Sequence, residues 1–227
     1  MTVEATPTTI GVLGGTGPLG RGLGLRLAQA GHPTTLGSRD PERAEAKAAE
    51  LRKTHGVSDA LLSGAGNAVA AAADVVVVAV PFDGVESTVT SLATTLGGKV
   101  VISCVNRLAF DDAGPRPVPV DAGSAAELIA ELAPDARVVG AFHHVPAGRM
   151  RRGDAPVEMD VLITGDDDDA CARVAMLAEA IPGMRAVRAG PLRLTRPLEE
   201  LSAVVVQINR RYGIAAGIRI AGLQNGG

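Results

Sequence analysis

The sequence is poor in the residue types on which several kinds of site depend. Its 227 residues include two cysteines, Cys104 and Cys171, with no paired spacing for a zinc or redox motif. Three phenylalanines, one tyrosine and no tryptophan leave few aromatic side chains on which nucleic-acid bases could stack. The 22 basic and 25 acidic groups form no long basic block, which argues against a nucleic-acid partner.

Long apolar runs and a leader segment are also missing. Stretches such as residues 75–81 are much shorter than the roughly 20 apolar residues that a membrane-spanning helix needs. The start of the chain, MTVEATPTT, has neither a basic region nor an apolar run, so no secretion signal is visible. We therefore expect a cytoplasmic protein with no membrane partner.

The distribution of lysine and tyrosine excludes two common catalytic devices. No lysine follows Lys99, so the second half of the chain has no catalytic lysine. The only tyrosine, Tyr212, is followed four places later by Ala216 and not by a lysine, which excludes a Tyr-x-x-x-Lys pair. The acidic run at 166–169 precedes a predicted helix, where carboxylates cap backbone N–H groups. We predict no metal site.

The hydrophobic pattern predicts an α/β fold. Apolar runs of strand length alternate with segments of helical periodicity, which is typical of a Rossmann-type, doubly wound parallel sheet. We expect one domain over residues 9–150 and a smaller C-terminal α/β part over 151–227 that contains an apolar helix. The predicted strands are 9–13, 34–36, 61–62, 74–80, 100–103, 138–142, 161–164 and 186–187; the predicted helices are 18–30, 41–54, 68–73, 84–96, 124–132, 170–181 and 198–212; and 111–119 is predicted to be an irregular loop.

A glycine-rich turn joins the first predicted strand to the first helix. Gly15, Gly17 and Gly20 match the pattern G-x-G-x-x-G in the strand and helix context that the motif requires. The first glycine permits a tight turn, the second lets backbone N–H groups approach a pyrophosphate, and the third lets the helix pack closely on the strand. The pyrophosphate would lie at the positive end of the helix. The alternative is a purely structural turn.

The end of the second predicted strand bears on the choice between NAD and NADP. An NAD site has an acidic residue there that binds the ribose 2′-hydroxyl. Here the residues are Ser38 and Arg39, with Arg43 one helical turn later, and this set suits a 2′-phosphate. Asp40 is the counter-argument, because it could be the acidic residue displaced by one place. We favour NADP.

The pair His143–His144 follows the predicted strand 138–142, at the edge where open α/β sheets bind ligands. Without a third ligand the pair does not indicate a metal site. A structural role for both histidines is the alternative.

Taken together, the motifs closely resemble those of the coenzyme F420-dependent NADP oxidoreductases, over residues 9–223. The resemblance implies direct hydride transfer between NADP(H) and the 5-deazaflavin coenzyme F420, small-molecule partners and a homodimer. The motifs are IGVLGGTG (10–17), LGSR (36–39), AVPF (79–82), SCVN (103–106), GSAAE (123–127), AFHH (141–144), AGPL (189–192), NRRY (209–212) and AGIR (216–219).

The resemblance also implies site residues at matching positions. Val80 and Pro81 would border the nicotinamide, and Ser202 would lie on the deazaflavin side. The residues expected where the two rings meet are His143, Val145 and Ala147. With the glycine turn, those expected to hold the phosphates and ribose are Gly15, Thr16, Gly17, Leu19, Ser38, Arg39 and Arg43. No catalytic acid or base is implied, because the coenzymes carry the reactive chemistry and the protein positions the rings.

Two other functions stay open. One is an NADP-dependent imine or ketone reductase, for which His143 would be the proton donor. The other is a non-catalytic NADP-sensing protein, since binding and turnover share the same glycine turn. The stretch 193–196 and Glu200 depart from the family pattern near the implied deazaflavin side, so they bear on the substrate.

The last predicted helix is apolar nearly all round, which is more than one monomer buries easily. We expect a twofold homodimer that uses this helix and the segment after it. The apolar residues concerned are Leu201, Val204, Val205, Val206, Ile208, Ile214, Ile218 and Ile220.

Overall fold

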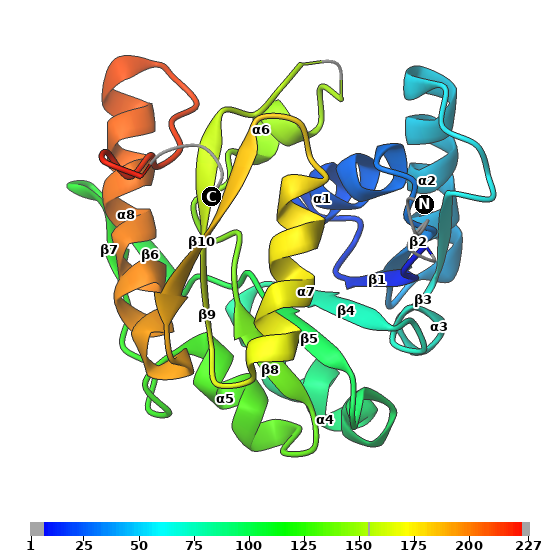
Figure 1. Cartoon of the computed structure of the whole chain (residues 1–227), viewed down its shortest axis with the longest axis horizontal. Coiled ribbons are helices and arrows are strands. Elements are labelled where there is room, and N and C mark those ends of the chain that lie inside the picture. Colours follow the sequence, from blue (N-terminus) through cyan, green and yellow to red (C-terminus); the bar gives the residue numbers. More distant parts are fainter. Residues whose placement is uncertain (1–6, 154, 224–227) are drawn as a thin grey trace.

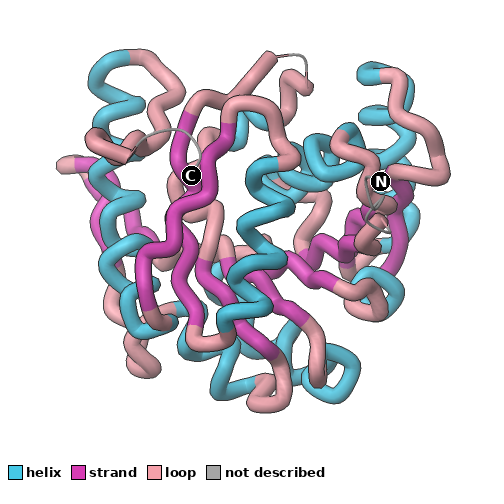
Figure 2. Tube along the Cα trace, in the orientation of Figure 1, coloured by secondary structure: helices cyan, strands magenta, loops and turns pink. Residues whose placement is uncertain are grey.

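The computed structural model describes residues 7–153 and 155–223. A sheet of eight strands crosses the molecule in the order β10-β9-β8-β5-β4-β1-β2-β3, and β6 and β7 form a separate hairpin (Figures 1 and 2). The strands are β1 (Ile10–Leu13), β2 (Thr34–Ser38), β3 (Leu62–Gly66), β4 (Val75–Val78), β5 (Val100–Ser103), β6 (Leu108–Asp111), β7 (Gly114–Pro117), β8 (Arg137–Gly140), β9 (Met159–Gly165) and β10 (Met184–Gly190).

Helices cover both faces of the sheet. The helices are α1 (Pro18–Gln29), α2 (Pro41–His55), α3 (Asn67–Ala70), α4 (Val85–Leu96), α5 (Ala125–Leu132), α6 (Ala147–Met150), α7 (Asp168–Glu179) and α8 (Thr195–Tyr212). Side chains of α1, α2, α6 and α7 form one buried cluster with the sheet, and side chains of α3, α4 and α5 form the other. In Figure 1, α8 and α2 lie at opposite ends of the molecule. Within the described ranges, no helix is long and apolar enough to cross a bilayer.

Strand β4 shows why the apolar runs become central strands. All four of its valines are fully buried, and they alternate between the two clusters. Val75 and Val77 pack on the side of α1 and α7, whereas Val76 and Val78 pack on the side of α4 and α5. Parallel strands buried on both faces read as continuous hydrophobic runs. The predicted doubly wound architecture is confirmed.

The sheet is mostly parallel, with one exception. Strand β9 pairs antiparallel with β8, and β10 then pairs parallel with β9, so the last two strands run opposite to the other six. Strands from both sides of residue 150 thus share one sheet. The connection from β8 to β9 therefore carries residues 141–153 past the carboxyl ends of the central strands.

The predicted irregular loop at 111–119 is wrong. Strands β6 and β7 pair antiparallel from Leu108 opposite Pro117 to Asp111 opposite Gly114. Prolines in this segment suggested a loop, but a two-stranded ribbon has open edges where a missing N–H is tolerated. The hairpin packs on α8, where a Cβ at Gly114 would lie 2.6 Å from Oε1 of Gln207.

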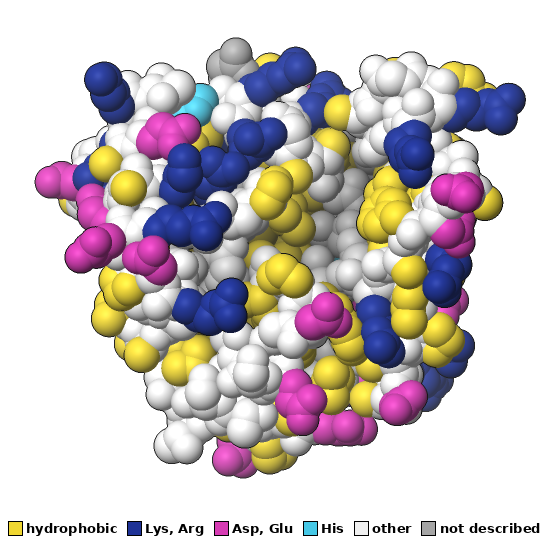
Figure 3. Space-filling model, turned by 180° about the vertical axis from the view of Figure 1, so that it is seen from behind, with side chains coloured by type: hydrophobic (Ala, Val, Ile, Leu, Met, Phe, Trp, Pro, Cys, Tyr) yellow, Lys and Arg dark blue, Asp and Glu magenta, His cyan; other side chains and the backbone are white. Residues whose placement is uncertain are grey.

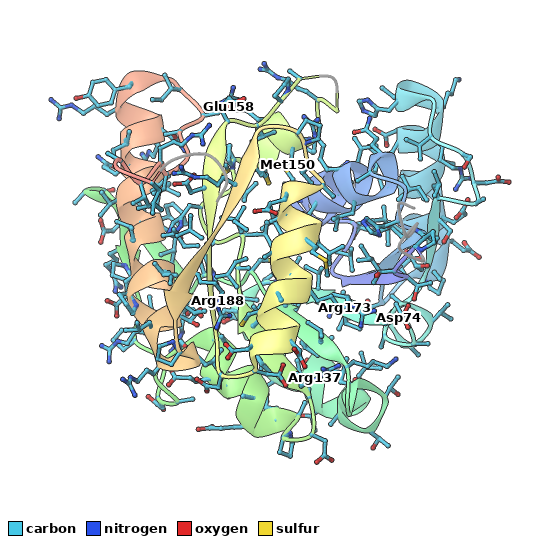
Figure 4. All side chains as sticks on the ribbon, in the orientation of Figure 1. Asp74, Arg137, Met150, Glu158, Arg173 and Arg188 are labelled. Carbon is cyan, nitrogen blue, oxygen red and sulfur yellow. The ribbon has the colours of Figure 1, made fainter. Side chains whose placement is uncertain are left out.

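The segment after α8 is bound to β9 by a buried carboxylate. Asp160, 1% exposed, accepts hydrogen bonds of 2.8 and 2.7 Å from Arg185 and one of 2.7 Å from the N–H of Ile220. The hydrogen bonds from Arg185 lower the pKa of Asp160. Arg219 of the same segment pairs with Glu158, which Figure 4 labels just before β9. These contacts make residues 214–223 an ordered part of the fold.

Candidate functional site

A pocket of about 770 Å³ lies at the carboxyl ends of β1, β2 and β4, the edge at which open α/β sheets bind ligands. From behind, the surface is hollowed near its centre, with apolar side chains on both walls (Figure 3). Eight of the residues predicted for NADP(H) line the pocket: Thr16, Gly17, Leu19, Ser38, Arg39, Arg43, Val80 and Pro81. The sheet thus brings residues from three loops to one cavity.

The turn that begins the pocket needs its glycines for close backbone contact. A Cβ at Gly15 would lie 2.8 Å from Cα of Leu36, so a glycine at this position lets the turn pack directly against β2. The left-handed backbone that permits the tight turn belongs to Gly14, with φ 75°, and not to Gly15 as predicted. A Cβ at Gly14 would lie 2.8 Å from the carbonyl oxygen of Ala79, the residue before Val80. The position of Ala79 and Val80, which form one wall of the pocket, therefore depends on a glycine at residue 14.

The N-terminus of α1 faces the same turn. A Cβ at Gly20 would lie 2.7 Å from the carbonyl oxygen of Gly14, so this glycine lets the helix pack closely, but on the turn and not on the strand. Gly17 is the N-cap and has no side chain to accept from the first-turn N–H groups, and Pro18 at N1 carries no N–H. The remaining first-turn N–H groups suit an anion such as a pyrophosphate.

The structure at the end of β2 shows what the carboxylate of Asp40 binds. Its carboxylate is the N-cap of α2, since Oδ1 accepts the backbone N–H of Arg43 at 3.0 Å. Its own N–H donates to Oγ of Ser38 at 3.1 Å. A carboxylate that caps a helix is less available to a ribose 2′-hydroxyl, whereas Arg39 is exposed beside the pocket. The arrangement favours a 2′-phosphate.

A second group of predicted residues lies beyond the pocket lining, after β8. His143, Val145 and Ala147 follow the strand, and Phe142 before them is buried with φ 62°. A left-handed backbone at a bulky residue is rare and persists only where its surroundings fix it. The segment is therefore held in an unusual conformation next to His143.

His143 is held by two other segments. Nδ2 of Asn106 donates to the carbonyl oxygen of His143 at 2.9 Å, and Oδ1 of the same amide lies 3.1 Å from Nδ1 of the imidazole. Oγ of Ser202 on α8 donates to that same carbonyl at 3.2 Å. Ser202 thus contacts His143 directly, at the same carbonyl oxygen as Asn106, a residue that was not among the predicted site residues.

Both histidines of the pair are buried and neutral. Burial and the neighbouring His144 lower the pKa of His143 to about 3, and the carbonyl of Val105 opposes this only partly. Burial also lowers the pKa of His144, whose Nε2 lies 2.7 Å from the carbonyl oxygen of Leu198. Neither imidazole carries the extra proton of a general acid near neutral pH.

Helix α6 connects the two groups of residues. A Cβ at Gly22 on α1 would lie 2.6 Å from Cβ of Met150 and 3.4 Å from the carbonyl oxygen of Ala147. Nε of Arg26 donates to the carbonyl oxygen of Met150 at 3.1 Å, and Figure 4 labels Met150 on α6. The segment after His143 therefore packs on the same helix whose N-terminus borders the pocket.

The sequence interpretation also missed Glu199. This carboxylate is 5% exposed and accepts the N–H groups of Ala125 at 2.9 Å and Ala126 at 3.2 Å, at the start of α5. Burial raises the pKa of Glu199 to about 7, against the two hydrogen bonds. Glu200, the departure from the family pattern, pairs instead with Arg196 in an exposed bridge of 2.9 Å. Glu199 therefore joins α8 to α5, and Glu200 does not.

Glu199→Gln should change the pH dependence of stability. A carboxyl whose pKa is about 7 in the folded chain and ordinary in the unfolded chain makes folding less favourable as pH rises between those values. The glutamine variant has no such carboxyl, so its free energy of unfolding should rise relative to that of the wild type by about 3 kcal/mol between pH 4.5 and 8. Urea unfolding at several pH values measures the difference. Glu200→Gln is the control, and the difference between its free energy of unfolding and that of the wild type should change little with pH. A difference that is equally independent of pH for Glu199→Gln would contradict the prediction.

The mostly parallel sheet, the glycine turn at the start of α1 and the pocket at that turn define a Rossmann-type dinucleotide-binding protein. Residues 9–107 match the family described as NADP oxidoreductase coenzyme F420-dependent. Relatives match nearly the whole chain as well, so the chain belongs to this family.

Two of these relatives are called F420-dependent NADP reductase. The one from Methanothermobacter thermautotrophicus is 37% identical over 94% of this chain and 95% of its own. The one from Methanocaldococcus jannaschii is 35% identical over 95% of this chain and 99% of its own. A solved structure described as a putative F420-dependent NADP reductase from Arthrobacter sp. FB24 has a TM-score of 0.80 and 29% identity, and the match covers 94% of this chain and 99% of the other.

Proposed function

We propose that this chain is an F420-dependent NADP reductase that transfers a hydride directly between NADP(H) and coenzyme F420. The curated relatives carry that activity in their names and match the chain over nearly their whole length. The observation that carries the proposal at the site is the pocket in which the glycine turn and the pair Ser38–Arg39 lie together.

Each part of the NADP(H) pocket has a proposed task. The first-turn N–H groups of α1 and the side chain of Thr16 bind the pyrophosphate. Ser38 and the guanidinium groups of Arg39 and Arg43 bind the 2′-phosphate by charge-assisted hydrogen bonds. Val80 and neighbouring Pro81 give the nicotinamide an apolar border. Gly14 and Gly20 have no room for a Cβ, so these positions of the turn carry no side chain. A bare backbone of this kind can approach a dinucleotide closely.

The second proposed half of the site holds the deazaflavin. His143, Val145 and Ala147 border the ring, and Ser202 fixes the loop that carries them. The nicotinamide and the deazaflavin supply the hydride donor and acceptor, so these residues align two rings at reacting distance and exclude water between them. We assign the NADP(H) side and the loop with His143, Val145 and Ala147 to residues 9–150, and the contribution of Ser202 on α8 to residues 151–227.

A spectrum of the deazaflavin tests the activity. Purified protein is mixed with F420 and either NADPH or NADH, and the visible absorbance of the oxidised deazaflavin is followed. We expect NADPH to bleach it and NADH to do so poorly. Binding of NADPH without bleaching would contradict the proposal and favour an NADP-sensing protein or a reductase of another substrate.

His143→Asn should impair binding more than turnover. Since His143 is neutral and acts by position, the variant should raise the KM for F420 severalfold and lower kcat by less than about tenfold, the cost of roughly one neutral hydrogen bond. NADPH affinity should be nearly unchanged. A thousandfold loss of kcat with normal binding would make His143 a general acid and favour an imine or ketone reductase.

The exposed face of α8 supports the proposed homodimer. Leu201, Val204, Ile208 and Tyr212 are 37–66% exposed and recur at helical spacing, so they form one apolar stripe. Val205, by contrast, is buried at 8% exposure and packs against the rest of the same chain. Only part of the apolar surface of α8 is therefore left for a second chain. Ile214 and Ile220, in the segment bound to Asp160, are also exposed.

Val204→Glu should separate the dimer. A carboxylate in the middle of an apolar interface would be desolvated without a partner, which strongly disfavours association. Light scattering should give about twice the chain mass of 23.0 kDa for the wild type and a single-chain mass for the variant. Val69→Glu is the matched control, because Val69 is 62% exposed on α3, and α3 lies on the opposite side of the molecule from α8 (Figure 1). A wild-type mass of one chain at micromolar concentration would contradict the dimer.

We also propose the cytoplasm as the working compartment. Cys104 and Cys171 are both buried free thiols, which suits a reducing environment. No nucleic-acid or membrane partner is needed for the proposed reaction.

A further inference from the structure

A buried nitrogen at the proposed deazaflavin side lacks a hydrogen-bond partner. His143 is 6% exposed, and its Nε2 is one of the few buried side-chain atoms in the described residues without such a partner. Buried polar atoms are nearly always paired, so an unpaired one in a native fold requires a specific reason. A bound ligand that supplies the partner is one such reason.

The orientation of Asn106 determines which kind of partner this is. The carbonyl oxygen of His143 only accepts, so the amide group 2.9 Å from it is the NH2 group of Asn106. Oδ1 of Asn106 therefore faces Nδ1 of His143 at 3.1 Å and requires a proton on that nitrogen. A neutral imidazole carries one proton, and burial keeps the pKa of His143 low, to about 3. Nε2 is left as a bare acceptor.

We propose that Asn106 is a positioning residue that presents Nε2 of His143 as a hydrogen-bond acceptor to an amide-type or imide-type N–H group of the bound ligand. The inference rests on the proposed placement of His143 beside the coenzyme rings. Both rings offer such a donor, because the nicotinamide has a carboxamide and the deazaflavin has an imide in its pyrimidine ring. The two sources share one chemistry, and analogues that lack the donor distinguish them.

His144 is expected to carry its proton on the other ring nitrogen, so it serves as a reference for the tautomer of His143. Its Nε2 lies 2.7 Å from the carbonyl oxygen of Leu198, an acceptor only, so Nε2 of His144 carries the proton. The adjacent buried imidazoles are therefore in opposite tautomers. The chain has four histidines, so substitution of His32 and His55 leaves a spectrum with two sites to assign.

The first measurement is ¹⁵N NMR of the ligand-free protein with labelled histidine at neutral pH. We expect His143 to be protonated at Nδ1 and His144 at Nε2. Asn106→Asp retains an acceptor for the Nδ1 proton and should preserve this pattern, whereas Asn106→Leu removes the acceptor and should not. A proton on Nε2 of His143 in the wild type, or a doubly protonated ring, would overturn the proposal regardless of any activity.

The second measurement is ligand binding followed by fluorescence. The probes are NADPH and F420, the NADPH analogue with acetyl in place of the carboxamide, and F420 methylated at the imide nitrogen. In the wild type, one analogue should bind at least tenfold more weakly than its parent, and that difference should shrink to less than threefold in Asn106→Leu. Equal differences in both proteins would mean that Asn106 is merely structural and would contradict the proposal.

Two controls separate the possible failures. Thermal unfolding of Asn106→Leu and Asn106→Asp shows whether each variant is folded, and Asn106→Asp should restore much of the analogue discrimination that Asn106→Leu loses. Failure of the wild type to bind both parent compounds would contradict the proposed function, whereas normal binding of both with no analogue discrimination would contradict only the role of Asn106 and His143.

Discussion

Arg39→Ala is expected to weaken NADPH binding by tenfold or more, about 1.5 kcal/mol, and to leave NADH binding almost unchanged. The reason lies in the end of β2, where Arg39 is exposed on the pocket and Asp40 is occupied as the N-cap of α2. The 2′-phosphate is the group that distinguishes the two coenzymes, so loss of its charged partner affects only the one that carries it. Titration of the variant with both coenzymes measures the effect.

The double variant Arg39→Ala/Arg43→Ala should lose about a hundredfold in NADPH affinity if the two guanidinium groups contribute comparably. Arg188→Ala is a matched control, because Arg188 on β10, an edge strand of the sheet, is exposed in an ion pair with Asp168 and does not line the pocket. The control should bind NADPH normally. A wild-type protein that bound NADH as tightly as NADPH would contradict this account of the strand end.

Gly14→Ala is expected to have a large effect on both stability and binding. Its φ of 75° is left-handed, and a Cβ would lie 2.8 Å from the carbonyl oxygen of Ala79. Backbone strain and the clash together should lower the free energy of unfolding by about 2–4 kcal/mol. The Ala79–Val80 wall has to move, and a displacement of about 1 Å at such a site costs on the order of a hundredfold in function.

Gly56→Ala separates strain from clash. Gly56 ends α2 with φ 67°, but no atom lies within 4 Å of the position its Cβ would take. This variant should lose only the conformational part, about 1–2 kcal/mol, and keep its NADPH affinity. Urea unfolding and NADPH titration of both variants give the comparison. Equal losses of stability and binding in the two would show that the contact between Gly14 and Ala79 is unimportant.

The parts of the fold that the sequence predicts correctly depend on local chemistry. The turn at residues 14–20 and the helix that follows it lie within one β-α-β unit, where short-range glycine and capping patterns determine the backbone. The same unit places Ser38 and Arg39 on the pocket, where their role in binding NADP stays a prediction. Strand β4 was predictable because four consecutive valines, which are β-branched and apolar, are typical of a strand buried on both faces. The acidic run also behaves as expected, since Asp167 caps α7 by accepting the N–H of Ala170 at 2.7 Å.

The features that the sequence does not predict depend on contacts between distant segments. Glu199 caps a helix that starts 74 residues earlier, and any nearby carboxylate could have served as well. Asn106 meets His143 across 37 residues, and only the pairing of β5 with β8 brings them together. Sequence spacing reports which side chains share an element, but it does not report which elements pack side by side.

The proposed reaction requires the protein to align two coenzymes so that hydride passes directly from one ring to the other. The most direct measurement uses NADPH with deuterium at both hydrogens of nicotinamide C4, mixed with F420 and the wild-type protein in ordinary water. We expect reduced F420 to carry one deuterium at C5, and unlabelled NADPH in heavy water to introduce none at that carbon. Reduced F420 whose C5 hydrogen came from the solvent, or no reduction at all, would contradict it.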